Sequence, residues 1–342
     1  MNSRVIKFVA GAGKTTESIK YMQTHKNGLY LAFNNDVVRM ISDKGLLSKT
    51  IDAFFQSYLI PKLISIIPLI GFNKKVSYIN IDDLPSKFKG VPNIKINIDG
   101  TIANRTKNTP ISLNNTNEYL QSLGDFPNSL FIKYIFGKNE LRLTDELRAD
   151  LSSYLIENYP DLIINLIVSR FSYIIIDEAQ DLKGYRERFG KLIYDSNINL
   201  IILGDENQNI NAGGDWFESL SADEIQINSH RCPDTNCKWI RENLQIEIYG
   251  NDKLSQVLII KWEAVLDLDD GKRVLIYSQN AGKNKEIVGK WQGTKMTIKS
   301  AKGLTIDNDI VIIGATLSKK NLYTAITRTR KSVYSTVASC KN

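Results

Sequence analysis

The 342-residue sequence contains little cysteine and little histidine, which limits the metal and redox chemistry that it can support. The cysteines are Cys232, Cys237 and Cys340, and the histidines are His25 and His230. Cys232 and Cys237 are five positions apart, outside the close pairs usual for structural zinc, and no second pair completes a tetrahedral site. Three cysteines also provide no disulfide framework. The sequence therefore predicts no zinc site and a reducing, cytoplasmic (intracellular) location.

Long apolar runs are missing as well. The longest candidates, around Leu59–Ile70 and Leu162–Val168, are interrupted by Pro, Lys or Asn, and neither reaches the roughly 18 residues needed to cross a bilayer. The first residues, Met1–Ile6, run directly into an apolar strand and a glycine loop, which is not the layout of a signal peptide. We therefore expect no membrane span, no secretion signal and no membrane partner.

Charge and composition give broader limits. The 44 basic and 37 acidic residues leave a net charge of +7, which suits a polyanionic partner such as nucleic acid but also an ordinary solvated surface. With 42% hydrophobic and 24% charged residues, the chain can bury real cores, which excludes a mainly disordered protein. At about 150 residues per domain, the length suggests two domains.

Short apolar runs that end in polar or glycine-rich turns organise the first part of the chain. The clearest runs are Val5–Ala10, Leu29–Phe33, Tyr173–Ile176 and Leu200–Leu203. Stretches with helical character lie between them: Glu17–Thr24, Val37–Ser42 and Tyr185–Tyr194. Buried strands that alternate with helices predict an α/β fold with parallel sheets, and its functional residues are expected at the carboxyl ends of the strands.

We expect two domains, residues 1–222 and 223–342. An insertion at about 57–169 interrupts the first domain, with an expected loop at Asn104–Asn117 and expected helices such as Leu141–Asn158. The second domain has expected strands and an amphipathic stretch, at Arg273–Tyr277, Asp309–Gly314 and Leu322–Lys331. The insertion is expected to be helical or irregular.

A glycine loop, Ala10-Gly11-Ala12-Gly13-Lys14-Thr15, follows the first strand and opens the first helix. Glycines let backbone N–H groups approach phosphate oxygens, and a helix N-terminus adds positive potential. Lys14 would then reach the β- and γ-phosphates, and the Thr15 hydroxyl would bind Mg²⁺. The pattern departs from the usual phosphate loop at Phe8, where glycine is expected. The alternative is a chance Gly-Lys-Thr turn before a helix.

Two other strand ends carry acidic or amide side chains. The run Ile174–Asp181 ends in Asp177 and Glu178, which beside a phosphate loop would hold Mg²⁺ and activate the attacking water. The run Leu203–Gln208 places Gln208 where a neutral amide could sense the γ-phosphate. Acidic turns at strand ends are common, so each pattern also has a purely structural interpretation.

Two arginines in the second domain, Arg231 and Arg328, complete the set. Guanidinium groups that reach across a domain cleft stabilise charge on a transferred phosphoryl group. For an isolated arginine, a surface or structural ion pair is the simpler interpretation.

Seven segments, taken in order, resemble the motifs of superfamily 1 helicases of the UvrD/Rep type. The segments are AGAGKTT, TIDAFF, IDEAQD, GDENQNI, NSHRCP, TIKSAKGL and LYTAITR, which begin at residues 10, 50, 176, 204, 228, 297 and 322. They cover both ends of the chain. The resemblance implies two RecA-like domains with ATP and Mg²⁺ between them and single-stranded nucleic acid as partner, DNA in preference to RNA.

The resemblance also implies residue roles by position. The expected nucleotide-binding residues are Ala10, Gly11, Ala12, Gly13, Lys14, Thr15, Thr16, His230, Arg231, Gly303 and Arg328. The expected catalytic residues are Lys14, Glu178, Gln208, Arg231 and Arg328, and the expected Mg²⁺ ligands are Thr15 and Asp177. The expected nucleic-acid contacts are Phe33, Asn35, Thr50, Asp52, Trp216, Thr297 and Lys299.

The sequence departs from the family pattern at several positions. Asn211 and Gly213 replace aromatic residues that stack on bases, which shifts the expected stacking to Trp216. Thr305 replaces the usual glutamate that meets the ribose. Two alternatives to a DNA helicase or translocase stay open: a nucleic-acid-stimulated ATPase that remodels complexes without unwinding, and an RNA helicase. A non-catalytic module is disfavoured because Lys14, Glu178, Arg231 and Arg328 are all present.

Overall fold

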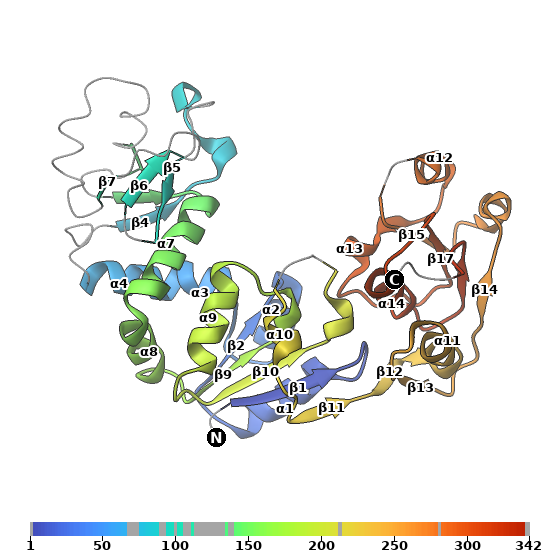
Figure 1. Ribbon diagram of the computed structural model, residues 1–342, viewed down its shortest axis with the longest axis horizontal. Helices are drawn as coiled ribbons and strands as arrows, with labels where there is room; N and C mark the ends of the chain where they lie inside the picture. Colours follow the sequence, from blue (N-terminus) through green and yellow to red (C-terminus); the bar gives the residue numbers. More distant parts are fainter. Residues whose placement is uncertain are drawn as a thin grey trace. The chain divides into compact units, whose positions relative to one another are not determined.

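The computed structural model describes residues 3–66, 75–88, 94–98, 101–104, 111–112, 134–135, 140–210, 214–279 and 282–338. The chain forms two compact units (Figure 1). The first unit comprises Met1–Ser3, His25–Ile176 and Leu182–Leu200, and the second comprises Arg4–Thr24, Asp177–Asp181 and Ile201–Asn342. The glycine loop, the acidic strand end and both arginines therefore belong to the same unit.

The sheet around the glycine loop lies in the second unit. Strand β1 (Ser3–Phe8) has β11 (Glu224–Gln226) on one side and β10 (Leu200–Gly204) on the other. Strand β11 runs parallel to β1, with Ile6 opposite Glu224. Because β11 follows residue 222, this sheet extends beyond the expected end of the first domain. The expected domain boundary itself stays a prediction.

A second sheet of the same unit is entirely parallel. Its five strands, in spatial order, are β14 (Val257–Ile259), β18 (Val333–Ser335), β17 (Ile310–Ile313), β15 (Val274–Tyr277) and β16 (Lys295–Thr297). The central strand β17 is buried along its whole length, as expected of a strand covered on both faces. The expected strands at 273–277 and 309–314 are confirmed.

Helices and a small extra sheet complete the second unit. The helices are α1 (Lys14–Thr24), α10 (Trp216–Ser219), α11 (Asp234–Leu244), α12 (Lys283–Lys290), α13 (Ile298–Ala301) and α14 (Lys319–Ile326). Strands β12 (Asn228–Pro233) and β13 (Tyr249–Asn251) pair in parallel. The expected amphipathic stretch at 322–331 is helical only to Ile326. Its remaining residues, 327–331, connect α14 to β18.

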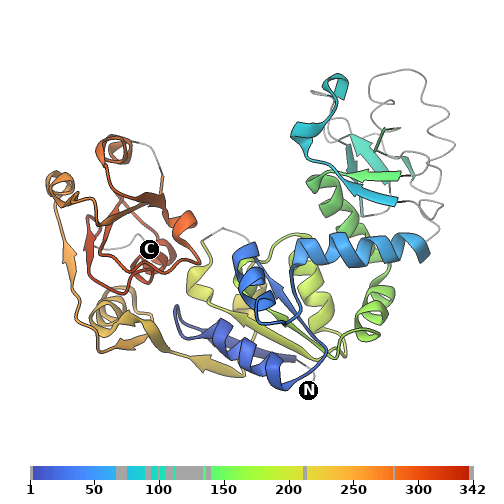
Figure 2. The same cartoon turned by 180° about the vertical axis from the view of Figure 1, so that it is seen from behind.

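The first unit contains three parallel strands in the order β9 (Tyr173–Ile176), β2 (Gly28–Ala32) and β3 (Ser48–Thr50). Strands β2 and β9 lie side by side in Figure 1, and Figure 2 shows them from behind. All five residues of β2 are buried. The helices of this unit are α2 (Asn35–Ser42), α3 (Ile51–Phe54), the π-helical turn η1 (Phe55–Leu59), α4 (Ile60–Ile66), α7 (Asp145–Asn158), α8 (Pro160–Val168) and α9 (Tyr185–Tyr194).

The insertion contains strands that the sequence interpretation did not predict. Strand β4 (Lys75–Tyr78) pairs in parallel with β8 (Glu140–Leu143), and β5 (Ile94–Ile96), β6 (Thr101–Asn104) and β7 (Ile111–Ser112) form an antiparallel sheet. The expected helix from Leu141 was wrong at its start, because alternate residues of β8 are buried and Thr144 caps α7 by accepting a hydrogen bond from the Leu147 N–H.

The loop expected at 104–117 was also wrong at the residues of this stretch that the structure describes. Asn104 ends β6 and Ile111–Ser112 forms β7, because their backbone groups pair within the antiparallel sheet. The other residues of that stretch lie outside the described ranges. Elsewhere the expected α/β architecture with parallel sheets is confirmed, as are the helices expected at 17–24, 37–42 and 185–194. None of the described helices is long and apolar enough to cross a bilayer.

We predict that Gly28→Ala destabilises the first unit. A Cβ atom at Gly28 would lie 2.1 Å from Cζ of Tyr173, whose ring cannot withdraw easily because its hydroxyl donates to the His25 carbonyl at 2.8 Å. Overpacking of this kind costs about 1–3 kcal/mol. Urea unfolding measures the loss. Gly289→Ala is the control, since a Cβ there meets nothing within 4 Å and alanine favours the helix. Equal stability of the two variants would contradict the prediction.

Candidate nucleotide site

The glycine loop connects β1 to α1 and needs its glycines for two reasons. Gly11 and Gly13 have φ angles of 77° and 92°, in the left-handed region that glycine adopts without strain. A Cβ atom at Gly11 would lie 2.7 Å from both Cβ of Arg231 and Oγ of Ser229. Strand β12 therefore approaches the loop closely, and the Ser229 hydroxyl donates to the Ala10 carbonyl at 2.7 Å.

Lys14, the first residue of α1, pairs with Glu178. Its Nζ lies 3.2 Å from Oε2 of Glu178, which also accepts a 2.6 Å hydrogen bond from Nε2 of Gln180. Burial works against the charged carboxylate, but Lys14, Lys302 and the Gln180 hydrogen bond hold the pKa of Glu178 at about 2. Burial also works against the charged ammonium, yet the neighbouring carboxylates raise the pKa of Lys14. Both groups are therefore ionised at neutral pH.

The expected Mg²⁺ ligands, Thr15 and Asp177, lie at the start of α1 and at the end of β9. Asp177 is 2% exposed and its Oδ1 accepts the Glu178 N–H at 2.8 Å. Within the described residues, no cluster of three or more His, Cys, Asp or Glu could hold a metal ion by itself. One carboxylate and one hydroxyl suit Mg²⁺ that completes its shell with phosphate oxygens and water. The metal role of these two residues stays a prediction.

Asp205, at the end of β10, lies at the centre of a buried hydrogen-bond network. Its Oδ2 accepts from Nε2 of Gln208 at 2.6 Å and from the Tyr323 hydroxyl at 3.0 Å. Its backbone N–H donates to Oε1 of Gln180 at 3.0 Å, and Gln180 in turn contacts Glu178. Burial raises the pKa of Asp205 above its ordinary value.

The expected arginines both lie in this site. Arg328 is 1% exposed, and its Nη2 donates to Oε1 of Gln208 at 2.9 Å. Burial, followed by repulsion from Arg231, lowers the pKa of Arg328 to about 9. Arg231 has a buried Nε atom that finds no hydrogen-bond partner in the described part of the chain. Two neighbouring guanidinium groups and an unused donor suit the binding of an anion.

His230 and Gly303 are placed less centrally. The backbone N–H of His230 donates to the Gly11 carbonyl at 3.0 Å, and its exposed ring lies 3.6 Å from the position of a Cβ at Gly13. This location suits contact with a nucleotide on the loop. Gly303 is exposed and has a φ of 86°. Thr16 is exposed on the first turn of α1.

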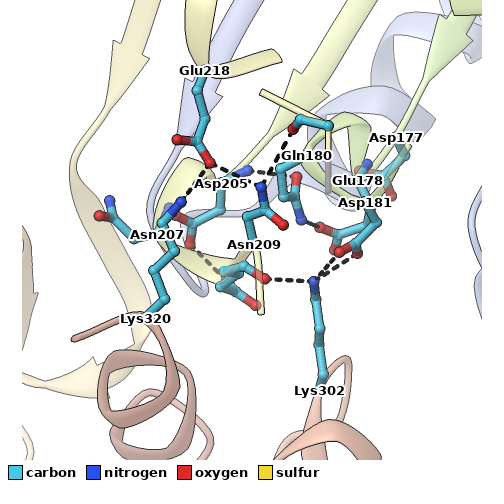
Figure 3. A network of polar contacts seen from close by, with 12 residues as sticks. Asp177, Glu178, Gln180, Asp181, Asp205, Asn207, Asn209, Glu218, Lys302 and Lys320 are labelled. Carbon is cyan, nitrogen blue, oxygen red and sulfur yellow. Dashed lines mark hydrogen bonds and ion pairs between the residues drawn. The ribbon is translucent and has the colours of Figure 1, made fainter. Parts of the chain in front are cut away.

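Two lysines complete the site although the sequence interpretation did not select them. Lys302 contacts both carboxylate oxygens of Asp181 and the Gln208 carbonyl, each at 2.6 Å (Figure 3). Lys320, on α14, pairs with Glu218 at 2.5 Å. Lys302 and Asp181 both lie within motifs that the sequence resembles, so their segments were recognised while their pairing was not.

Of the residues expected to contact nucleic acid in the first unit, some are exposed and others are hydrogen-bonded within the protein. Phe33 is 40% exposed and Asn35 is exposed at the start of α2. The Thr50 hydroxyl caps α3 by accepting from the Ala53 N–H at 3.0 Å. The Asp52 carboxylate is bound by Arg186 through two 2.6 Å hydrogen bonds, by Arg148 and by the Tyr185 hydroxyl. Asp52 is therefore engaged within the protein, which does not support its expected contact with a strand.

In the second unit, the expected stacking by Trp216 is not supported, because the residue is only 9% exposed. The Thr297 hydroxyl caps α13 by accepting from the Ser300 N–H at 3.0 Å, and Lys299 is exposed. Asn211 and Gly213 lie outside the described residues. The structure thus gathers the expected nucleotide residues in one place, whereas the expected strand contacts are distributed over both units.

Comparison with known proteins confirms the resemblance that the motifs indicate. Residues 73–212 match the model of the UvrD/REP helicase N-terminal domain. This region of the chain is similar to helicases of superfamily 1, and it includes Asp177, Glu178 and Gln208.

Several solved helicases are similar to the chain. Arterivirus nonstructural protein 10 (helicase) is 12% identical with a TM-score of 0.48, covering 97% of this chain and 59% of its own. A complex of that protein with DNA is 12% identical with a TM-score of 0.47, covering 98% and 61%. The PRRSV helicase is 13% identical with a TM-score of 0.47, covering 97% and 52%. The chain thus spans between half and about three fifths of their length. No curated protein matches this sequence.

We predict that the ion pair of Glu178 gives the protein an acid-sensitive part of its stability. The pKa of Glu178 is about 2 in the fold, against 4.5 ordinarily, so the ionised carboxylate stabilises the fold fully above about pH 4.5 and progressively less as the pH falls toward about 2. Glu178→Gln removes this contribution, so its stability deficit relative to wild type should shrink between about pH 6 and pH 3. Urea unfolding over this range measures the deficit.

Glu286→Gln is the control for this pH series. Glu286 pairs with Lys290 on the exposed face of α12, where an ion pair contributes little. The loss of stability of Glu286→Gln relative to wild type should therefore be small at every pH. A Glu178→Gln deficit that stays constant from about pH 6 to pH 3 would show that the carboxylate is not selectively stabilised in its ionised form.

Proposed function

We propose that the protein is an ATP- and Mg²⁺-dependent helicase or translocase that moves on single-stranded nucleic acid, with DNA preferred over RNA. The observation that carries this proposal is the meeting of Lys14, Glu178, Gln208 and Arg328 beside one glycine loop. The UvrD/REP match supports helicase activity, and the preference for DNA is what the resemblance of the seven motifs implies.

The loop and Lys14 would bind the phosphates, through backbone N–H groups and a positive charge at a helix N-terminus. Bound Mg²⁺, held by Thr15, Asp177 and phosphate oxygens, would neutralise charge that develops on the phosphates. A carboxylate with a pKa near 2 is a poor base. When phosphates draw Lys14 away from Glu178, the pKa of that carboxylate rises, so substrate binding itself prepares Glu178 to accept a proton from water.

Arg231 and Arg328 would stabilise the transferred phosphoryl group. Burial and then repulsion from Arg231 lower the pKa of Arg328, and a bound anion would offset this repulsion. The unpartnered Nε of Arg231 gives such an anion a further donor. Gln208, which holds Nη2 of Arg328 at 2.9 Å, keeps one guanidinium in place before the nucleotide arrives.

The contact with nucleic acid would depend mainly on phosphates. Lys299 and Asn35 are exposed and polar, Phe33 offers one exposed ring, and the net charge is +7. Trp216 is buried, so base stacking is limited. This limited stacking favours the second candidate function, a nucleic-acid-stimulated ATPase that remodels complexes without unwinding. An RNA helicase is the further alternative.

Strand displacement on 3′-tailed and 5′-tailed duplexes of DNA and of RNA, with ATP and Mg²⁺, tests the proposal. A helicase should separate one tailed DNA duplex and not its blunt counterpart. Stimulated hydrolysis without strand separation would support the remodelling ATPase instead. Separation of RNA duplexes alone would identify an RNA helicase, and the absence of nucleotide hydrolysis on every substrate would refute all three.

We predict that Glu178→Gln lowers turnover by about 10²-fold or more, because it keeps the shape of the side chain but removes the base. Binding of the Mg²⁺–nucleotide should persist. Lys14→Ala should weaken both binding and turnover, because it removes a positive charge from the phosphates. Steady-state hydrolysis and equilibrium titration with a fluorescent nucleotide separate the two effects. Wild-type turnover by Glu178→Gln would refute its catalytic role.

We also predict that binding of single strands depends strongly on salt and weakly on sequence, since phosphate contacts release counterions. Lys299→Ala should reduce the slope of log affinity against log salt by about one. Lys290→Ala is the control, because Lys290 is already paired with Glu286 on α12. Fluorescence anisotropy with oligonucleotides of different sequence measures these slopes. A flat plot for the wild type would contradict phosphate-based binding.

A further inference from the structure

The hydroxyl of Tyr323 bridges two segments of the nucleotide site. Tyr323 lies on α14 and is fully buried, with an exposed fraction of 0%. Its hydroxyl oxygen accepts the backbone N–H of Ala10, in the glycine loop, at 2.9 Å. The same hydroxyl donates to Oδ2 of Asp205, at the end of β10, at 3.0 Å. One side chain therefore connects the phosphate-binding loop to Asp205.

A second connection runs from Asp205 to Arg328. Oδ2 of Asp205 accepts from Nε2 of Gln208 at 2.6 Å, which orients the amide so that its Oε1 faces Arg328. Nη2 of Arg328 donates to that oxygen at 2.9 Å. Because an amide group has a donor side and an acceptor side, fixing the donor on Asp205 also fixes the acceptor that holds the arginine.

These bonds form a closed circuit. Tyr323 lies within α14 and Arg328 follows the end of that helix, five residues later, while Asp205 and Gln208 lie three residues apart after β10. Two hydrogen bonds join the pairs, and a third joins Asp205 to Gln208. The Arg328 guanidinium is also held by the Thr324 carbonyl, which accepts from its Nε at 3.0 Å, and by the Thr327 hydroxyl, which accepts from Nη2 at 3.2 Å. These two bonds lie within its own segment, whereas the circuit fixes Nη2 relative to Asp205 and the glycine loop.

We propose that Tyr323 is a positioning residue that sets Arg328 relative to the glycine loop. The inference rests on the proposed hydrolysis of nucleotides and adds a residue to it. Tyr323 does not touch the reacting atoms. It acts through Asp205 and Gln208 on Arg328, and through Ala10 on the loop that would carry the phosphates.

We predict that Tyr323→Phe lowers kcat about tenfold or more. The change keeps the buried ring but removes the hydroxyl, which leaves the Ala10 N–H without this acceptor and Asp205 without one donor. KM should change by less than about threefold, because the loop and Lys14 still bind the phosphates. Tyr58→Phe is the matched control, since it removes a 2.9 Å hydrogen bond from a buried tyrosine to the Leu166 carbonyl in the first unit.

A double-mutant cycle separates positioning from general stability. In an Arg328→Ala background, Tyr323→Phe should lower kcat by less than about twofold further, because the residue it positions is already gone. A purely structural role predicts the same fold-loss in both backgrounds. The preference for a non-hydrolysable triphosphate over the diphosphate, measured by titration, should also fall in Tyr323→Phe and not in Tyr58→Phe.

The outcomes distinguish this inference from the proposed function. If the wild type hydrolyses ATP but Tyr323→Phe matches it, or if the two substitutions lower kcat independently, the positioning role is refuted while the hydrolysis stands. If the wild type binds no nucleotide, the proposed function fails, and the positioning role fails with it. A selective loss of kcat that vanishes in the Arg328→Ala background supports the inference.

Discussion

The buried carboxylate of Asp205 is the group on which the arrangement of the nucleotide site depends. It receives hydrogen bonds from Gln208 and Tyr323, while its backbone N–H reaches Gln180. Removing a donor from a buried acceptor lowers the free energy of unfolding by more than the hydrogen bond itself contributes, because the acceptor stays buried without a partner. The surrounding segments are therefore held together by the requirement that this one carboxylate remains satisfied.

The chemistry of the site depends on competition between ion pairs. Lys14 is bound to Glu178 and Lys302 is bound to Asp181. The first pair keeps Lys14 charged within a buried region and keeps the Glu178 carboxylate ionised. In the proposed function, a bound polyphosphate would weaken the first of these pairs, because it would offer Lys14 more negative charge than one carboxylate does.

The sequence predicted the site better than it predicted the insertion. Local patterns indicate the glycine loop and Glu178: a loop that must accept positive φ, and a carboxylate that follows a buried strand. Gln208 and Arg328 were selected through the resemblance of their segments to the helicase motifs, and the structure brings them together by a hydrogen bond. The partners of Asp52 could not be found in this way, since Arg148 and Arg186 are distant along the chain and are brought to it only by tertiary packing. The burial of Trp216 likewise follows from packing around α10 and not from its neighbours in sequence. In the insertion, β4 pairs with β8, with Lys75 opposite Glu140, and local periodicity does not reveal a pairing between segments so far apart in the sequence.

The backbone at Glu178 has a consequence for how this position can change. Its φ of 52° lies in the left-handed region, which costs a residue other than glycine on the order of 1–2 kcal/mol. Glycine or asparagine would relax that strain, yet either would discard the carboxylate that pairs with Lys14. The left-handed backbone and the ion pair therefore change the free energy of unfolding in opposite directions at this position. A substitution that relieves the strain also leaves the buried ammonium of Lys14 without its carboxylate partner, so neither glycine nor asparagine is expected to stabilise the fold.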